Sequence, residues 1–429
     1  MYIPFETIGK IIAFFCTKNT KDKVLNYFLE LKTTQNCKYI EKNSKKVLKK
    51  IKKEKNKRKL RVAFLCSDET KWKCESLFKL LEKSEHFDPF ILTTKTNAPK
   101  NSSKQMNSKE VLDVYNFFAK KGFKTYFAYD TLKNKFIQIK KFKPDLIFYQ
   151  QPWYIKTQQG PVVSSKFALT YYVPYYITNV SSPMEYYLRF HRYIHRYYVL
   201  NDIIKDFYSS KMKNGGVNLK VVGHTQLDYY LTNKNPKNPK NYVIYAPHWS
   251  INYPQENYAT FEWNGKEILD FAKLHPEINW VFKPHPILKH RLLTQNVMNA
   301  EEIENYWNEW KNIGLVNEGG DYMDLFANSK AMISDCGSFL TEYLLTNKPL
   351  IRLVSKNACP YNPSAKKVVS AYYSASNLEE LYKLLDKVIL KNEDTMQDKR
   401  EEIIKELHLN SNNAALNILN DLKNELDIK

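Results

Sequence analysis

Four short motifs in the second half of the sequence combine residue types that could hold a diphosphate and help to break it. They are residues 223–228 (GHTQLD), 245–250 (YAPHWS), 282–286 (FKPHP) and 334–338 (SDCGS). Each of the last three follows an apolar run of strand length. Because residues just beyond the strand ends of an α/β sheet gather in one crevice, we expect these motifs to meet in space. Their histidines, lysine and small hydroxyl or acidic side chains suit an anionic, diphosphate-bearing ligand.

An imidazole follows each of two expected strand ends. His285 lies between two prolines, and since proline fixes φ and prevents helix continuation, the histidine is held in a defined turn. Lys283 precedes it, and the two groups together can neutralise a diphosphate and stabilise its departure. His248 is expected in the same crevice. We predict that His285 and His248 are catalytic and that Lys283 binds the donor. The alternative for each histidine is an ordinary surface turn.

The junction between a strand and a helix at 334–338 is a predicted phosphate site. Ser334 or Asp335 can cap the helix, and the first N–H groups of that helix can hold a phosphate. Glu342 lies four residues after Ser338 on the same helix face and could accept hydrogen bonds from a ribose. The predicted donor-binding residues beside Lys283 are Ser334, Asp335, Gly337, Ser338 and Glu342. A plain helix cap without a ligand is the alternative.

The sequence lacks the usual signatures of cofactor and metal sites. It has only 11 glycines and no glycine-rich phosphate loop, which disfavours a dinucleotide-binding fingerprint and a P-loop NTPase. No cluster of Asp, Glu and His has metal-ligand spacing, so we expect neither a cofactor nor a metal. If turnover needs a metal, Asp321, Asp324 and Asp335 are the first places to look. The six cysteines include no C-x-x-C pair, which predicts reduced thiols in a cytosolic protein.

The chain carries a net charge of +21, which points to anionic partners. Residues 45–61 contain eleven basic residues and one acidic residue. This run predicts either a contact with an anionic membrane surface or simply a solvated helix. No nucleic-acid-binding signature accompanies it, so no nucleic acid is expected. No apolar run is long enough to span a membrane, and the run at 11–16 lacks the cleavage site of a secretory signal.

Apolar runs of strand length alternate with helix-like segments over most of the chain, which predicts an α/β fold with parallel sheets. Residues 1–59 are expected to form a basic helical segment. The polar stretch 232–241 (TNKNPKNPKN) is the best domain boundary. We therefore predict two doubly wound, Rossmann-type domains, at 60–231 and 232–429, that face each other across a cleft. The last helix of the second domain can return to the first domain. A helix is expected at 131–141.

Aromatic residues are concentrated between the two sets of motifs. Residues 149–198 contain fourteen Phe, Trp or Tyr, a density twice that of the whole chain. Aromatic surfaces with hydroxyl tips suit sugar rings, whereas ordinary core packing is the alternative for about half of these residues.

Taken in order, the motifs resemble the CDP-glycerol glycerophosphotransferase family of teichoic-acid and capsule polymerases. The resemblance rests on Gly-x-x-x-x-Asp, Tyr-Ala-Pro-x-Trp, Lys-Pro-His-Pro and Ser-Asp-x-x-Ser, followed by Lys348-Pro349-Leu350. In the first half it adds Lys71-Trp72-Lys73, residues 143–152 (KPDLIFYQQP) and 172–175 (YVPY). It covers residues 60–355 and implies a GT-B fold, with a CDP-linked donor bound mainly by the C-terminal domain. It further implies peripheral attachment to the cytoplasmic face of the membrane and an acceptor side formed by Gln150, Gln151, Tyr175 and Lys73.

The sequence departs from this family at the expected catalytic base. Teichoic-acid polymerases of the family carry a Trp-His-Gly-Thr segment whose histidine is the proposed base, whereas the comparable stretch here, 172–175, has no histidine. A glycine of capsule-type members is replaced by Tyr176. The segment 223–226 reads Gly-His-Thr-Gln where Pro-Arg is common, so His224 receives no role. The base and the acceptor therefore stay unassigned.

These patterns predict a transferase that moves an alditol phosphate, with glycerol phosphate as the first expectation. The donor is a CDP-alditol, the acceptor is a hydroxyl of a growing capsule, teichoic or lipooligosaccharide chain, and CMP is released. One alternative is a GT-B glycosyltransferase that uses a nucleotide sugar such as CMP-Kdo, because Lys-Pro-His-Pro strings also occur there. Another is a basic glycan- or nucleic-acid-binding protein without catalytic activity.

Overall fold

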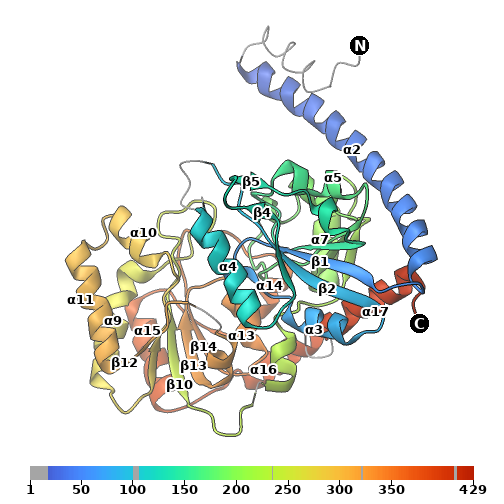
Figure 1. The fold of residues 1–429 in the computed structure, drawn as a ribbon. Coiled ribbons are helices and arrows are strands. Elements are labelled where there is room, and N and C mark those ends of the chain that lie inside the picture. Colours follow the sequence, from blue (N-terminus) through green and yellow to red (C-terminus); the bar gives the residue numbers. More distant parts are fainter. Residues whose placement is uncertain (1–17, 100–105, 234, 320–321, 410–412) are drawn as a thin grey trace.

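Two parallel β-sheets organise the chain in the computed structural model, which describes residues 18–429 apart from 100–105, 234, 320–321 and 410–412. The first sheet has seven strands in the order β3-β2-β1-β6-β7-β8-β9, and the second has six in the order β12-β11-β10-β13-β14-β15. Figure 1 shows the two sheets as separate layers, each flanked by helices. This α/β architecture with two parallel sheets agrees with the prediction.

The strands of the first sheet are β1 (Leu60–Cys66), β2 (Phe87–Thr93), β3 (Thr125–Phe127), β6 (Leu146–Tyr149), β7 (Leu169–Tyr172), β8 (Arg196–Val199) and β9 (Leu219–Val221). Those of the second are β10 (Tyr242–Ala246), β11 (Trp280–Phe282), β12 (Gly314–Val316), β13 (Ser329–Ser334), β14 (Leu350–Leu353) and β15 (Tyr373–Ala375). Central strands such as β6 and β7 are buried along their whole length. This burial explains their continuous apolar runs, because helices cover both faces of a parallel sheet.

The α-helices are α2 (Lys18–Glu54), α3 (Glu75–Lys83), α4 (Ser108–Lys120), α5 (Pro161–Ser164), α6 (Arg189–Tyr193), α7 (Asp202–Lys211), α8 (Asp228–Asn233), α9 (Phe261–Leu274), α10 (Leu288–Thr294), α11 (Ala300–Ile313), α12 (Met323–Ala327), α13 (Phe339–Leu344), α14 (Pro363–Val369), α15 (Leu378–Leu384), α16 (Gln397–Glu406) and α17 (Ala414–Leu426). A π-helical turn, Leu385–Leu390, extends α15. Asparagine side chains begin six of these helices by accepting a first-turn N–H, at Asn107, Asn201, Asn299, Asn362, Asn377 and Asn413.

Each sheet has one place where the strand order reverses direction. It lies between β1 and β6 in the first sheet and between β10 and β13 in the second. Connections leave these two neighbouring strands on opposite sides, so the chain opens a crevice at their carboxyl ends. Ligands in open α/β sheets bind in such crevices, and the motifs at 245–250 and 334–338 follow β10 and β13 directly.

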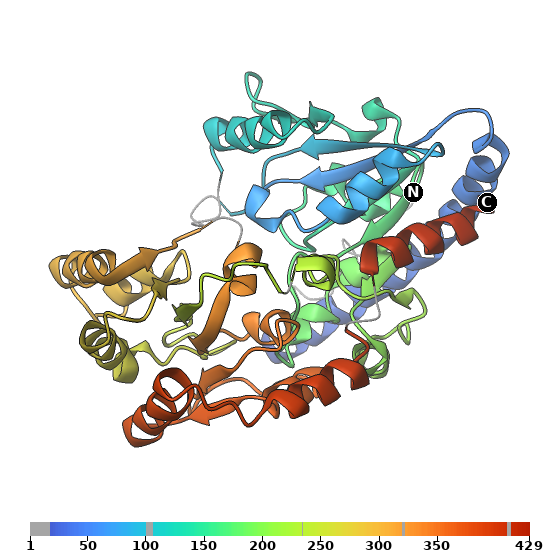
Figure 2. The same cartoon turned by 90° about the horizontal axis from the view of Figure 1, so that it is seen from below.

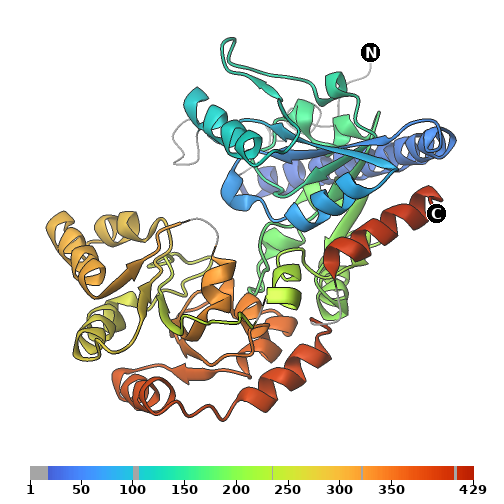
Figure 3. The same ribbon diagram turned by 60° about the horizontal axis from the view of Figure 1, so that its bottom comes forward.

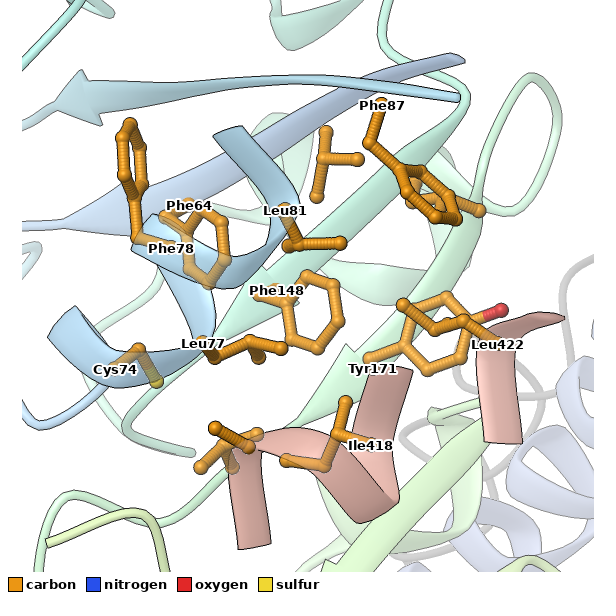
Figure 4. Close-up of a cluster of buried hydrophobic side chains, with 14 of the residues drawn as sticks. Phe64, Cys74, Leu77, Phe78, Leu81, Phe87, Phe148, Tyr171, Ile418 and Leu422 are labelled. Atoms are coloured by element: carbon orange, nitrogen blue, oxygen red, sulfur yellow. The ribbon is translucent and has the colours of Figure 1, made fainter. Parts of the chain in front are cut away.

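Helix α17 follows the second sheet in the sequence but packs on the first. Its Ile418 and Leu422 are fully buried together with Leu77 of α3 and Phe148 of β6. Figure 4 shows these side chains meeting in one cluster, and Figure 2 shows α17 lying beside the first sheet. The carboxylate of Asp228 accepts the backbone N–H groups of Ala414 and Ala415 at 2.7 and 3.0 Å, which fixes the start of α17.

Helix α2 is long, and only part of it packs on the first half of the molecule. Ile40, Val47 and Ile51 are buried, and Glu30 pairs with Arg192 of α6 at 2.6 Å. Figure 1 shows the rest of the helix extending away from the sheets. The predicted helical segment 1–59 thus contains α2, whereas the apolar run at 11–16 lies outside the described residues. Within the part of the chain that the structure describes, none of the helices combines the length and hydropathy needed to cross a membrane.

The expected helix at 131–141 is wrong. This stretch contains a two-residue antiparallel pair, β4 (Tyr129–Asp130) with β5 (Lys135–Phe136), and a 3-10 turn, Ile139–Phe142. The carboxylate of Asp130 accepts the N–H groups of Leu132 and Lys133, and Asn134 adopts a positive φ of 50°. These local side-chain hydrogen bonds offer the backbone an alternative to helical bonding, so a turn forms instead.

Candidate active site

The carboxyl ends of β10, β11 and β13 are tied together by hydrogen bonds that place the motif residues side by side. The Ser334 hydroxyl donates to the carbonyl of Ala246 at 2.7 Å, and the His285 N–H donates to the carbonyl of Pro247 at 3.2 Å. Strand pairing sets Tyr245 opposite both Phe282 and Ile333. The three motifs therefore leave the sheet at the same level, as their spacing predicted, and Figure 3 shows this end of the second sheet turned toward the first half.

The two predicted histidines lie together in this crevice. The ring centroids of His248 and His285 are 5.5 Å apart, and the Trp249 ring lies 5.6 Å from His248 and 5.9 Å from His285. His248 is 7% exposed, whereas His285 is half-buried. Burial, and next the proximity of His285, lower the pKa of His248 well below its ordinary value. His248 is therefore neutral at physiological pH.

Asp335 anchors the loop that carries His248. Its carboxylate accepts the His248 N–H at 2.6 Å, and also the N–H and hydroxyl of Thr260 at 2.6 and 2.8 Å. Burial is the largest influence on this group and raises the pKa of Asp335 to about 6. The expectation that Ser334 or Asp335 caps α13 is wrong, because Ser334 binds the Ala246 carbonyl and the Cys336 N–H, and Asp335 binds His248 and Thr260. Ser338 occupies the N-cap position without a side-chain capping bond.

Two lysines, one from each half of the molecule, converge on a single ring. The ammonium groups of Lys283 and Lys73 lie 5.0 and 5.1 Å from the centroid of Tyr322. Lys283 is 5% exposed and donates to Asn317 Oδ1 at 3.3 Å. Burial lowers the pKa of Lys283 to about 8. The structure thus brings Lys73, predicted for the acceptor side, beside Lys283 on the donor side.

Glu342 completes this charged cluster from α13. It is 1% exposed, and its carboxylate accepts the Gln226 side-chain amide at 2.8 Å. Burial raises the pKa of Glu342 to about 7, while Lys73 opposes that shift. The Gln226 amide also donates to the Tyr322 hydroxyl at 2.7 Å. Glu342 therefore links the two halves through Gln226.

The remaining residues of the 334–338 motif line the same junction. The Gly337 carbonyl accepts the amide of Asn179, which belongs to the first half of the chain, and the Ser338 hydroxyl lies 3.3 Å from the Cys336 thiol. An added Cβ at Gly337 would meet the Tyr258 ring at 3.5 Å, an ordinary contact distance. Asn179 also accepts the Thr341 hydroxyl at 2.7 Å, so this end of the crevice is closed by contacts between the halves.

A second pocket lies at the reversal point of the first sheet, beyond the ends of β1, β2 and β6. Its lining includes Gln150, Gln151, Lys71, Lys95 and Asp68. The Gln150 Oε1 accepts the Lys73 N–H at 3.1 Å, while its Nε2 is buried without a partner, and so is Gln151 Oε1. Buried amides with unused hydrogen-bonding groups in a pocket are suited to a polar ligand. Gln150 and Gln151, which were predicted for the acceptor side, both line this pocket.

Tyr175 does not line this pocket but contacts Lys71, which does. The Lys71 ammonium lies 5.5 Å from its ring, and the Trp153 ring lies 6.1 Å away. Burial, and next the negative charge of Glu185, raise the pKa of Tyr175. Other aromatic residues of 149–198, such as Tyr171 and Tyr197, are fully buried in the sheet core. The aromatic-rich stretch therefore divides into a core set and a small set beside the pocket.

Metal-ligating side chains do not gather in groups of three or more among the described residues. Asp324 accepts the Tyr229 hydroxyl at 3.3 Å and Asp335 holds the His248 loop, whereas Asp321 lies outside the described residues. Lys283 and Lys73 bring positive charge to the crevice, and the Arg291 guanidinium lies 6.0 Å from the Trp249 ring beside the two histidines.

Several residues of the site escaped the sequence reasoning. Ser250 binds His248, and Glu256 lies 3.8 Å from His248 Nε2. The Tyr322 ring lies beneath both lysine ammoniums, and Gln226 donates to the Tyr322 hydroxyl. The His-x-Ser spacing at 248–250 was visible in the sequence and could have identified Ser250. Gln226 lies in the motif at 223–228, which was also a signal, whereas Glu256 and Tyr322 have none, because only the tertiary fold brings them to the crevice.

Comparison with known proteins supports the resemblance. Residues 211–418 match the family described as CDP-Glycerol:Poly(glycerophosphate) glycerophosphotransferase. No curated protein sequence matches the chain.

Solved structures share the fold at low sequence identity. A putative UDP-N-acetylglucosamine 2-epimerase from Listeria monocytogenes is 13% identical over 86% of this chain and 98% of its own, with a TM-score of 0.55. The UDP-GlcNAc 2-epimerase from Neisseria meningitidis bound to UDP-GlcNAc is 14% identical over 85% and 99%, with a TM-score of 0.53. A variant of the wall teichoic acid polymerase TagF is 12% identical over 92% and 98%, with a TM-score of 0.51.

At these identities the structural likeness establishes the fold, which is GT-B with two Rossmann-like domains. The matched segment contains the crevice residues His248, Lys283, His285 and Asp335. Residues 211–418 thus match the CDP-glycerol:poly(glycerophosphate) glycerophosphotransferase family, and this match supports an enzyme of the glycerophosphotransferase type.

Proposed function

We propose that this enzyme transfers glycerol phosphate from CDP-glycerol to a hydroxyl of a bacterial surface glycan, of the teichoic or capsule kind, and releases CMP. The observation that carries the proposal is the convergence of His248, His285 and Lys283 at the carboxyl edge of the second sheet. This edge lies in the segment that matches the glycerophosphotransferase family.

The donor's diphosphate would lie against the two histidines and the lysine pair. Lys283 is buried and carries a charge that the surrounding protein destabilises, so an anion in the crevice would relieve that cost. Lys73 adds a second positive charge from the first half. Ser338 and Gly337 would contact the same phosphate or the ribose. In this proposal, Asp335 and Ser334 hold the loops rather than the ligand.

The acceptor would enter through the pocket of Gln150 and Gln151. Its unpaired amide groups suit the hydroxyls of a polyol or sugar, and Lys71 and Lys95 suit phosphate groups along such a chain. Tyr175 offers an aromatic edge for a sugar ring. The acceptor hydroxyl oxygen attacks the β-phosphorus, the bond from that phosphorus to the bridging oxygen breaks, and CMP leaves with that oxygen.

Positive charge at the leaving diphosphate would come from side chains. The lysine ammoniums and the imidazole N–H groups stabilise charge that develops on the phosphate oxygens. We propose that turnover needs no divalent cation, because these groups provide the stabilisation that a metal ion gives in other phosphotransferases.

Helix α2 would hold the enzyme against the cytoplasmic face of the membrane. The helix presents the exposed residues Lys42, Lys45, Lys46, Lys49, Lys50 and Lys53, and the turn that follows it adds Lys57 and Lys59. Each basic residue near an anionic leaflet contributes about 1 kcal/mol. Such a patch would bring the enzyme close to a lipid-linked acceptor.

Isotopic phosphorus tests the proposed reaction. CDP-glycerol labelled at the β-phosphorus is incubated with the enzyme and a glycerol-phosphate oligomer, and the products are separated. We expect label in the oligomer and unlabelled CMP, and we expect neither with His285→Ala. Label that stays with the nucleotide, or turnover of CMP-Kdo in its place, would show glycosyl transfer instead. A thermal-stability screen of CDP-glycerol, CDP-ribitol, UDP-sugars and CMP-Kdo identifies the donor, because a ligand at 100 times its Kd adds about 2.7 kcal/mol.

A further inference from the structure

Ser250 stands behind His248 in a fully buried position, and its hydroxyl oxygen has three close neighbours. His248 Nδ1 lies 2.8 Å away, and the backbone N–H groups of Tyr258 and Ala259 donate to the oxygen at 2.8 and 3.3 Å. The Ser250 side chain has no exposed surface, so water does not compete for these bonds.

The number of hydrogens and lone pairs on this hydroxyl determines the direction of the bond to His248. A serine hydroxyl has one hydrogen and two lone pairs. The two backbone N–H groups occupy both lone pairs, so the hydroxyl hydrogen points to His248 Nδ1. Nδ1 is then an acceptor without a proton, and the neutral imidazole carries its hydrogen on Nε2.

The opposite side of the ring agrees with this assignment. Glu256 Oε2 lies 3.8 Å from His248 Nε2, and an acceptor facing that nitrogen favours a hydrogen there. The other titratable groups around His248 are the His285 ring, Asp335 at its backbone N–H, and the Tyr258 ring at 6.4 Å. Burial keeps the imidazole neutral by lowering the pKa of His248, so a single tautomer is expected near neutral pH.

Nδ1 of His285 also accepts a hydrogen bond, but its donor is a backbone N–H and not a serine hydroxyl. Its Nδ1 accepts the backbone N–H of Ile287 at 3.3 Å. A nitrogen that accepts a hydrogen bond carries no proton, so the hydrogen of neutral His285 is also on Nε2. The two imidazoles therefore present the same kind of nitrogen in one crevice.

We propose that Ser250 is a positioning residue that holds His248 as the Nε2–H tautomer, so that His248 and His285 donate a pair of hydrogen bonds to one anionic group. The identity of that group, the diphosphate of the donor, rests on the proposed function. A histidine held in this form donates a hydrogen bond and does not remove a proton through Nδ1. The base of the transfer reaction is therefore a group other than His248.

Nitrogen NMR of the full-length protein with ¹⁵N-labelled histidine tests the tautomer without any substrate. The His248 and His285 signals are assigned from the spectra of His248→Gln and His285→Gln. In the wild type we expect unprotonated Nδ1 and protonated Nε2 at His248 between pH 6 and 8, and the same assignment for the neutral form of His285. Ser250→Ala should give a mixture of tautomers at His248, and Ser250→Thr, which keeps a hydroxyl, should retain the Nε2–H form.

A matched variant separates this effect from loosening of the loop. Thr260→Val removes a different hydroxyl from the same loop, the one that donates to Asp335 at 2.8 Å, and leaves the contact between Ser250 and His248 in place. We expect it to keep the wild-type tautomer. A wild-type His248 with its hydrogen on Nδ1, or an unchanged tautomer in Ser250→Ala, would overturn the proposal.

Kinetics add a second readout. We expect Ser250→Ala to lower kcat by roughly ten- to a hundredfold, the usual effect of losing a group that orients a functional histidine. His248→Gln, whose side-chain amide can donate from a similar place, should retain at least tenfold more activity than His248→Ala. Equal activities of the two variants would indicate that His248 acts as a base, which contradicts the proposal. If the tautomers are as expected but CDP-glycerol is not turned over, the proposed function fails while the role of Ser250 stands.

Discussion

Replacing Lys283 by methionine should make the protein more stable at neutral pH while abolishing transfer. Lys283 is 5% exposed, lies between the rings of Tyr322 and Phe339, and donates to the partly exposed Asn317. Methionine has a similar length and packs well against aromatic rings. The substitution therefore removes a buried charge without leaving a large cavity.

The magnitude follows from the pKa of Lys283. Burial lowers it from 10.5 to about 8, and at roughly 1.36 kcal/mol per pKa unit this difference amounts to about 3 kcal/mol. Below pH 8 the lysine is protonated in both states, so the folded protein bears this whole cost. Between pH 8 and 10.5 the unfolded state binds more protons, so the wild-type free energy of unfolding rises with pH in that window.

Urea unfolding of the wild type and Lys283→Met at two pH values measures the effect. We expect the variant to be more stable by about 3 kcal/mol at pH 7 and by roughly half of that at pH 9.5. Burial also lowers the pKa of Lys348 to about 8, but that contribution is common to both proteins and cancels in the difference. Lys289→Met, at a side chain that is 35% exposed, is the control and should show no such pH-dependent gain. A variant less stable than the wild type at pH 7, or a gain that does not shrink at pH 9.5, would refute the reasoning.

Four further predictions concern the site and helix α2. His285→Ala should lower transfer by 10² to 10³ with an unchanged melting temperature, and activity within about threefold of the wild type would remove its catalytic role. Asp335→Ala leaves three buried donors without an acceptor. At about 1–3 kcal/mol for each unsatisfied donor, it should destabilise the protein by several kcal/mol in the same urea assay, and Asp335→Asn should destabilise it less. Replacing Lys46 and Lys49 by Glu should weaken binding to anionic vesicles at least thirtyfold at low salt, because each basic residue contributes about 1 kcal/mol. Replacing Lys109 and Lys383 by Glu is the control and should leave vesicle binding unchanged. Transfer should survive EDTA; complete loss restored by Mg²⁺ would reveal a metal site.

The strands and their order along the chain were readable because buried parallel strands are continuous apolar runs between polar or proline boundaries. β10, Tyr242–Ala246, is an example, because it is an apolar run between the polar stretch 232–241 and Pro247. The short edge strand β15, Tyr373–Ala375, was missed because its central serine interrupts the apolar pattern. Helix α7 did have a signal in the sequence, because Ile203, Ile204, Phe207 and Tyr208 follow helical spacing after the capping Asn201.

The candidate site was readable wherever its residues directly follow strands. His248, Lys283 and His285 could be placed in one crevice because the ends of parallel strands meet at one edge of the sheet. The ammonium of Lys73 could not be placed, because it crosses from the first half to the ring of Tyr322 in the second. The link between Gln226 and Glu342 likewise spans 116 positions of sequence, and no local pattern reports a contact of that kind.

The return of α17 to the first sheet sets an order for folding during synthesis. Ile418, Leu422 and Leu426 belong to the same core as β1 and β6, yet the ribosome makes them only after the whole second sheet. At about 5–20 residues per second, the first sheet waits roughly 10 to 40 s for this helix. During that time the apolar face shown in Figure 4 is exposed on the nascent chain. The first half would thus complete its core last, and fragments that end before Ala414 should need chaperones to stay in solution.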